Sequence, residues 1–228
     1  MRSDVGALTT ANQQLGNVKG LLTTTISGLN NVSNTLSTMR DTLINLANSA
    51  TTGSERTQYA AQYQSLAANV KTFIQDSKYQ GNTLIANIGG TAYFAHVAVV
   101  RNEVGATYGI STFSGSAFFG SINFTGTQLA AATTVASKIT NGGTFIKMMN
   151  NIGNMLNTYG SANTYITNQV SYNNDKIDSL NSGLGSMIDA DLAKESAQMQ
   201  ALQIRQQLGT QSLSIANQAP SALLSLFK

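Results

Sequence analysis

The sequence of 228 residues contains no cysteine, no tryptophan, one proline and one histidine. The absence of cysteine excludes a disulfide framework and thiolate metal sites. Charged residues make up only 10% of the chain and the net charge is +3, whereas typical soluble proteins carry about 25% charged residues. Because lysine and arginine are never clustered, we expect no nucleic-acid partner. No run of about 20 apolar residues occurs, so we also expect no membrane span.

Leucine occupies every seventh position of the N-terminal region, and the residue three places after each leucine is mostly apolar. This spacing keeps one stripe of a helix against a partner, and no proline interrupts it. It predicts one long helix over residues 8–46. The flanking positions are mostly threonine, serine and asparagine, so charge pairing does not select the partner. The leucines form the predicted seam of a helical rod: Leu8, Leu15, Leu22, Leu29, Leu36 and Leu43.

A second helix is predicted after the stretch "NSATTGSE", with Ser54 as its N-cap. Its apolar stripe repeats the same spacing, and the short connection implies that it returns antiparallel to the first helix. The stretch "KYQGNTLI" then indicates a turn, with Gly81 as the turn residue. The predicted stripe consists of Tyr59, Tyr63, Leu66, Val70 and Phe73.

Residues 88–140 differ in character from the helical regions before them. The stretches "TAYFAHVAVV", "ATYGISTF" and "FFGSINF" are short, rich in β-branched and aromatic residues, and separated by glycine and serine. We interpret them as three strands of a small β-containing insert.

A third helical region opens at "NGGTF" and carries an apolar stripe interrupted by Asn163 and Asn173. Single polar residues in such a seam can fix the register of a helix, and we expect that role here. Gly183 and Gly185 predict a hinge, with a new helix starting near Asp189, whose carboxylate suits a helix N-terminus. The stripe consists of Phe145, Met149, Ile152, Leu156, Tyr159, Ile166, Val170, Ile177, Leu180, Leu184 and Met187.

These elements predict a mainly α fold with a small β-containing insert, built as an elongated antiparallel, coiled-coil-like helical rod with a further C-terminal helix. The predicted domains are N-terminal rod helices with a hairpin (1–87), the insert (88–140), a C-terminal rod helix (141–185) and a C-terminal helix (186–228).

Few residues could support catalysis or metal binding. His96 lies between apolar residues of a predicted strand, and a single histidine with no orienting partner is usually structural. Asp191 and Glu195 share a helix face and could hold a divalent cation weakly, but acidic residues in a first helical turn are explained by the helix dipole. We therefore predict neither an enzyme nor a cofactor or metal site. Six aromatic residues of the insert could stack on sugar rings or form its core: Tyr93, Phe94, Phe113, Phe118, Phe119 and Phe124.

The C-terminal tail is apolar over a broad helical face and carries no charge between Arg205 and Lys228. A helix lying on a membrane surface would carry lysine and arginine on its polar face, which this tail lacks. We therefore expect a protein partner to cover it. The predicted self-assembly residues are Leu192, Met199, Leu202, Leu208, Leu213, Ile215, Leu223, Leu224, Leu226 and Phe227.

Residues 188–227, "IDADLAKESAQMQALQIRQQLGTQSLSIANQAPSALLSLF", resemble the C-terminal segment of bacterial flagellins. The matching motifs are the acidic "DAD", the run from Gln203 to Gly209, "ANQAP" and the closing "LSL". Residues 26–55 resemble the N-terminal rod helix of the family and its following loop, and "KYQGNTLI" resembles its hairpin. The insert resembles no family that we can name.

The resemblance implies a structural subunit of the bacterial flagellar filament, in which the terminal helices of many copies pack together. It implies a homopolymer with other flagellin subunits, an export chaperone, and cap and junction proteins as partners. It also implies an extracellular location in the flagellum, reached without a cleavable signal peptide. An alternative is a flagellin-like cell-surface protein that binds polysaccharide through the insert.

The sequence departs from the family pattern in two ways. By this resemblance, the chain begins inside the rod helix. Family members carry roughly fifty further N-terminal residues, which hold the export signal and a helix that pairs with the tail. We therefore expect this chain alone neither to be exported nor to polymerise. In "LSTMRDTLIN", Thr38 and Thr42 stand where many flagellins present an arginine and a leucine to the innate immune receptor of animals. Only Arg40 and Asp41 keep that pattern, so we expect weak activation of the receptor.

Overall fold

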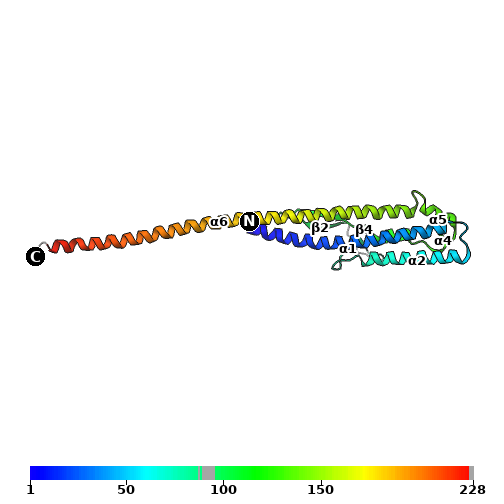
Figure 1. Ribbon diagram of the computed structural model, residues 1–228, viewed down its shortest axis with the longest axis horizontal. Coiled ribbons are helices and arrows are strands. Elements are labelled where there is room, and N and C mark those ends of the chain that lie inside the picture. The colour runs from blue at the N-terminus through cyan, green and yellow to red at the C-terminus, as the bar shows by residue number, and fades with distance from the viewer. Residues whose placement is uncertain (87, 89–95, 226–228) are drawn as a thin grey trace. The chain divides into compact units, whose positions relative to one another are not determined.

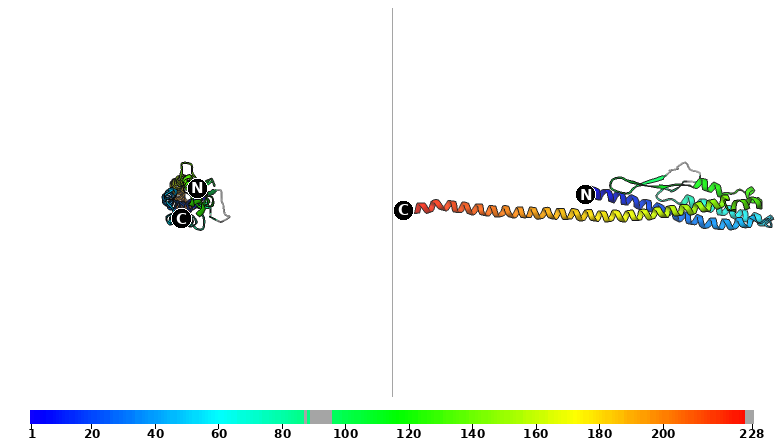
Figure 2. Two further views of the ribbon diagram at one scale, coloured as in Figure 1. Left: turned by 90° about the vertical axis from the view of Figure 1, so that its right-hand side faces the viewer. Right: turned by 90° about the horizontal axis from the view of Figure 1, so that it is seen from above.

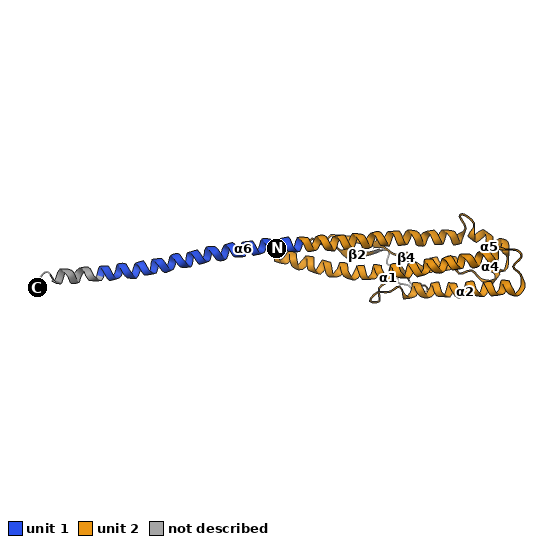
Figure 3. Cartoon of the chain, viewed as in Figure 1, with its two compact units in different colours: residues 1, 176–228 blue, residues 2–175 orange. Residues whose placement is uncertain are grey.

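The computed structural model describes residues 1–86, 88 and 96–225, with the side chains of 86, 96 and 217–225 excepted. The chain divides into two compact units (Figure 3), one formed by residues 2–175 and one by Met1 with residues 176–228. The mainly α class with a small β-containing insert is confirmed.

The predicted N-terminal helix is present as α1 (Arg2–Ala47), slightly longer than the leucine pattern indicated. All six seam leucines are fully buried. Helix α2 (Gly53–Asp76) packs against α1, as the short connection predicted. Its N-cap is Thr52, which has extended backbone angles, so the assignment of Ser54 as N-cap was wrong. Figures 1 and 2 show α1 alongside both α2 and the first part of the last helix.

Two positions of the buried stripe of α2 lie one residue later in the sequence than predicted. Tyr63 and Val70 are buried, but the positions next along the core are Ala67 and Ile74. Leu66 and the two other predicted stripe residues are half-buried at the edge of the same core. The spacing therefore located the helix face correctly to within one position.

The turn predicted at Gly81 is confirmed. Gln80 and Gly81 have φ angles of 50° and 80°, and positive φ at both central residues defines a type I′ turn. Tyr79 and Asn82 close the turn with a pair of main-chain hydrogen bonds, each 2.9 Å long. Glycine suits the second position because it adopts positive φ without a steric penalty.

The insert and the residues just before it form two small sheets. Strand β2 (His96–Val100) pairs antiparallel with β3 (Thr107–Ser111), and β1 (Ile85–Ala86) pairs parallel with β4 (Phe113–Ser114). The first two predicted strands are thus present in part, since residues 89–95 lie outside the described residues.

The third predicted strand is wrong, because "FFGSINF" falls mostly in helix α3 (Gly115–Ile122). The Ser114 hydroxyl accepts a hydrogen bond from the main-chain N–H of Ala117 and caps this helix. Phe118 and Ile122, four residues apart, then face the core together. Two further short helices were not predicted: α4 (Gly126–Ala130), which begins with a capping box, and α5 (Ala132–Ile139).

The last helix, α6, runs from Thr144 to Ser225 without interruption. It follows a sharp turn at Gly142, where φ is +86°. The hinge predicted at Gly183 and Gly185 is wrong, because both glycines keep helical backbone. Glycine in a helix interior costs only about 1 kcal/mol relative to alanine, which does not by itself end a helix.

Every seventh residue of α6 is buried from its start to the end of the first unit: Phe145, Ile152, Tyr159, Ile166 and Asn173. Met149 and Leu156, between these positions, are half-buried. This stripe and the seam of α1 contribute to one hydrophobic core, which also receives α2 and the insert.

Candidate assembly surface

The C-terminal part of α6 exposes large apolar side chains. All side chains of residues 186–216 are exposed. Two of its leucines, Leu202 and Leu213, are 62% and 67% exposed. Four further predicted residues, Leu192, Met199, Leu208 and Ile215, are also more than half exposed. Leu223, Leu224, Leu226 and Phe227 lie outside the described side chains.

Two further exposed apolar residues, Ile188 and Ile204, were not among the predicted assembly residues. Met187 is 57% exposed, so its assignment to the apolar stripe of the rod was wrong. The signal for Ile204 was present in the sequence, since it lies four residues before Leu208 on the same helix face.

At about 100° per residue, the exposed apolar residues from Ile188 to Ile215 fall on two opposite faces of the helix, and Met187 lies on neither. One face carries Ile188, Leu192, Met199, Leu202 and Leu213. The other carries Ile204, Leu208 and Ile215, preceded along the helix by Ala190, Ala193, Ala197 and Ala201. A helix with two opposite apolar faces needs apolar neighbours on both sides to remove these faces from water. Alanines at the start of the second face would allow a close approach there.

The acidic residues of this segment were considered as a weak cation site. Among the described residues, no group of three histidine, aspartate or glutamate side chains is close enough to hold a metal ion. Asp189, Asp191 and Glu195 are exposed. They lie in the interior of α6, so the prediction that a new helix starts near Asp189 was wrong. The side chain of His96 lies outside the described part of the chain. No described helix has a stretch long and apolar enough to cross a bilayer.

The leucine seam of α1 offers no assembly surface, because all six leucines are 0% exposed within one chain. Of the four positions compared with the immune-receptor motif, Thr38, Arg40 and Asp41 are exposed. Thr42 is buried, and its hydroxyl donates a 3.0 Å hydrogen bond to the main-chain carbonyl of Thr38. A side chain at position 42 is therefore not presented on the surface.

The aromatic residues of the insert form its core. Phe118 and Phe124 are buried, and Phe113 and Phe119 are half-buried against the same core. Phe124 stacks on Tyr63 of α2, with ring centroids 5.6 Å apart and planes nearly parallel. Phe113 and Phe118 line part of a shallow pocket of about 340 Å³. None of the four rings is exposed, and the polysaccharide-binding alternative has no support. Tyr93 and Phe94 lie outside the described residues.

Two buried tyrosines tie the insert to the rod. The Tyr63 hydroxyl donates a 2.6 Å hydrogen bond to the main-chain carbonyl of Ile122. The Tyr159 hydroxyl reaches the main-chain carbonyls of Leu84 and Ser111, at 3.3 Å and 3.0 Å. Burial raises the pKa of both phenols well above their ordinary value of 10.0, because the phenolate would lose its hydration.

Alkaline pH is therefore expected to destabilise the fold. Below pH 10 both tyrosines are neutral in the folded and the unfolded chain, so they contribute no pH dependence to the free energy of unfolding. Above pH 10 only the unfolded chain releases these protons, so the free energy of unfolding falls by about 1.4 kcal/mol per pH unit for each tyrosine. Chemical denaturation at pH 8 and pH 11 measures the fall. The variant Tyr63→Phe/Tyr159→Phe should show a shallower dependence, and an equally steep one would contradict the assignment.

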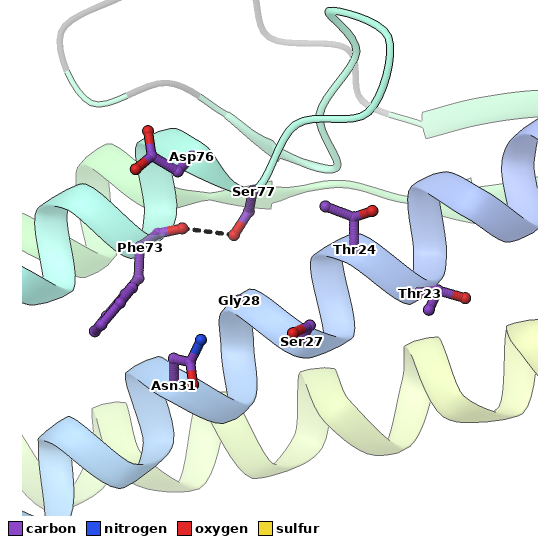
Figure 4. A pocket seen from close by; sticks show the side chains of 8 residues that line it. All are labelled: Thr23, Thr24, Ser27, Gly28, Asn31, Phe73, Asp76 and Ser77. Carbon is purple, nitrogen blue, oxygen red and sulfur yellow. Dashed lines mark hydrogen bonds between the residues drawn. The ribbon is translucent and has the colours of Figure 1, made fainter.

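A shallow pocket of about 350 Å³ lies where α1 passes the C-terminal end of α2 (Figure 4). It is lined mainly by small hydroxyl-bearing side chains, and Asp76 is its only charged residue. Gly28 lies opposite Ser77, whose hydroxyl donates a 2.6 Å hydrogen bond to the main-chain carbonyl of Phe73. A Cβ atom at position 28 would collide with the Ser77 Oγ and lie 3.0 Å from its Cβ. Beside this pocket, α1 therefore comes very close to Ser77, the residue that follows α2.

Replacing Gly28 by alanine is expected to lower the free energy of unfolding by about 1–3 kcal/mol, because the added methyl group overfills this contact. A Cβ atom added at Gly16, on the same helix, would have no neighbour within 4 Å. Gly16→Ala should instead stabilise the chain by up to about 1 kcal/mol, through helix propensity alone. Urea denaturation of the two variants measures both effects, and shifts of the same sign would contradict the close contact.

Solved structures with the same architecture define the class of fold. A Bacillus cereus flagellin superposes with a TM-score of 0.61 at 18% identity, covering 71% of this chain and 88% of that protein. A putative flagellar hook-associated protein from Vibrio parahaemolyticus superposes with a TM-score of 0.60 at 14% identity, covering 78% of this chain and 92% of that protein. At these identities the likeness establishes the fold alone.

Sequence comparisons identify the family. The sequence pattern described as the bacterial flagellin C-terminal helical region matches residues 144–227. Flagellin FljM of Caulobacter vibrioides is 36% identical over 152 residues, which cover 63% of this chain and 55% of FljM. A Brucella melitensis flagellin is 29% identical over 190 residues, which cover 76% of this chain and 63% of that protein. The chain belongs to the bacterial flagellin family, and it spans between 55% and 63% of the length of these two relatives.

Proposed function

We propose that this chain is a structural subunit of a bacterial flagellar filament. The observation that carries the proposal is the pair of exposed apolar faces on residues 188–215 of α6. Leaving so many large apolar side chains in water is unfavourable by about 25 cal/mol per Å² of apolar surface. Membership of the flagellin family supplies the partner, which is other flagellin subunits.

A flagellar filament is an extracellular structure, and this chain would reach it without a cleavable signal peptide. A chaperone that covers the two apolar faces before export would keep them from associating early. Cap and junction proteins of the flagellum would meet the same segment at the filament ends. The chemistry of such a subunit is non-enzymatic.

Charge placed on an apolar face should block assembly. Leu208→Asp puts a carboxylate into a contact that is buried in every subunit, and burying an unpaired charge costs several kcal/mol. We expect at least a tenfold loss of sedimentable filament. The substitution is made in the gene of the bacterium that produces the protein, so that any flanking segments are present, and filaments are examined by electron microscopy.

The matched control is Gln207→Asp, which adds the same charge one residue earlier, on the polar side of the helix between the two apolar faces. This variant should assemble nearly as the wild type does. Filaments of normal length and number from Leu208→Asp would contradict the proposed function.

A further inference from the structure

The seam between α1 and α6 does not by itself select one alignment of the two helices. Leucine recurs every seven residues on α1, and a buried aliphatic or aromatic residue recurs every seven residues on α6, from Phe145 to Ile166. Sliding one helix along the other by seven residues would again place apolar side chains against apolar side chains. Since each residue of an α-helix advances 1.5 Å, such a slip would move α6 by about 10 Å.

The stripe of α6 ends on a buried polar residue. Asn173 is 0% exposed and occupies the next heptad position after Ile166. Both hydrogens of its amide group are used: Nδ2 donates to Asn12 Oδ1 at 2.8 Å and to the main-chain carbonyl of Arg101 at 3.0 Å. Its Oδ1 accepts a 2.9 Å hydrogen bond from Gln169.

Asn12 of α1 is joined to two consecutive residues of α6. Its Oδ1 accepts from Asn173, and its Nδ2 donates to Asn174 Oδ1 at 2.8 Å. The carbonyl of Arg101 directly follows strand β2, so the same amide also fixes the hairpin of β2 and β3 to the two helices. Three elements far apart in the sequence are therefore joined by the amide of Asn173.

We propose that the Asn12–Asn173 pair, with the carbonyl of Arg101, selects the single register of α6 against α1 in the first unit. A seven-residue slip would keep apolar side chains against apolar side chains but would separate the buried amide of Asn173 from the half-buried Asn12 and Arg101. An unpaired amide in a buried position is penalised strongly. The register is thus set by hydrogen bonds, and the apolar seam supplies stability without selecting the alignment.

Two other polar residues of α6 bear on this proposal. Asn163 also interrupts the stripe, but its buried Oδ1 has no hydrogen-bond partner among the described residues, so it does not contribute to the selection. The Tyr159 hydroxyl bonds to main-chain carbonyls of the insert and is a second tether of α6. A test of the asparagine pair is therefore sharpest in a Tyr159→Phe background.

The absence of cysteine allows spin labels to be placed cleanly. Labels at Gln13→Cys on α1 and Thr158→Cys on α6, both exposed positions, report the alignment by pulsed electron paramagnetic resonance. Tyr159→Phe alone should give one distance. Adding Asn12→Leu/Asn173→Leu should produce a second population, shifted by about 10 Å, the displacement of a seven-residue slip.

Leu22→Ala in the same background is the control for lost stability, since it should lower the unfolding temperature and keep a single distance. If the Asn12→Leu/Asn173→Leu variant lacks the helical circular dichroism of a folded chain, Asn12→Leu alone is measured, because it leaves α6 unchanged. A single distance at the Tyr159→Phe value in the folded asparagine variant overturns the proposal.

Discussion

Replacing Arg56 by methionine is expected to lower the free energy of unfolding by about 3 kcal/mol, because one guanidinium group donates charge-assisted hydrogen bonds to four main-chain carbonyls. Nε donates to Thr51 at 2.9 Å, and Nη1 donates to Leu129 at 2.8 Å. Nη2 donates to Leu46 at 2.7 Å and to Asn48 at 3.1 Å. The last carbonyls of a helix have no partner within the helix, and Arg56 satisfies that of Leu46 in the last turn of α1.

Arg56→Lys separates charge from geometry. A lysine keeps the positive charge but cannot reach carbonyls of α1, the connecting loop and α4 at once, so we expect a loss of about 2 kcal/mol. Lys71→Met removes the same charge from an exposed position of α2 and should change stability by less than about 0.5 kcal/mol. Chemical denaturation followed by circular dichroism measures all three variants. An effect of Arg56→Met no larger than that of Lys71→Met would contradict this role.

Replacing Tyr63 by alanine should have the largest effect on stability, a loss of about 4 kcal/mol, because it empties the aromatic centre of the first unit. The ring is fully buried, lies parallel to Phe124, and has its centroid 6.5 Å from that of Phe145. It thus joins α2 to the insert and to the start of α6.

Tyr63→Phe keeps the ring and removes only the hydrogen bond to Ile122, so a loss of about 1–2 kcal/mol is expected. Tyr59→Ala, one turn earlier at a half-buried position of the same helix, should have a smaller effect than Tyr63→Ala. Thermal and urea denaturation rank the three variants. Equal losses for Tyr59→Ala and Tyr63→Ala would contradict the central position of Tyr63 in the core.

The long helices could be predicted because their signal is repeated many times. Six leucines at intervals of seven define one face of α1 without any knowledge of its partner. Residues 115–140 gave no such repetition, and "FFGSINF" has the composition of a strand. Its helical form depends on the Ser114 cap and on a core contributed by distant elements.

The polar junctions were harder to predict than the apolar seams. Asn173 could be noticed as a polar interruption of a stripe, but its partners Asn12 and Arg101 are more than seventy residues away in the sequence. Nothing in the sequence around Arg56 indicates that its side chain bonds to three separate segments. The sequence predicted one broad apolar face on the C-terminal segment, because a period of 3.6 residues is visible even where the partner is absent. The distribution of these residues over two opposite faces was not predicted.

Helix α6 draws on two different sources of stability along its length. From Thr144 to Asp175 its conformation is secured by tertiary packing, because every seventh side chain is buried. From residue 186 to 216 all side chains are exposed, so only local helix propensity supports the conformation, and such support is marginal in water. Each neighbour that covers this segment would therefore also stabilise its helix, so that association and helix formation are thermodynamically coupled in the same residues.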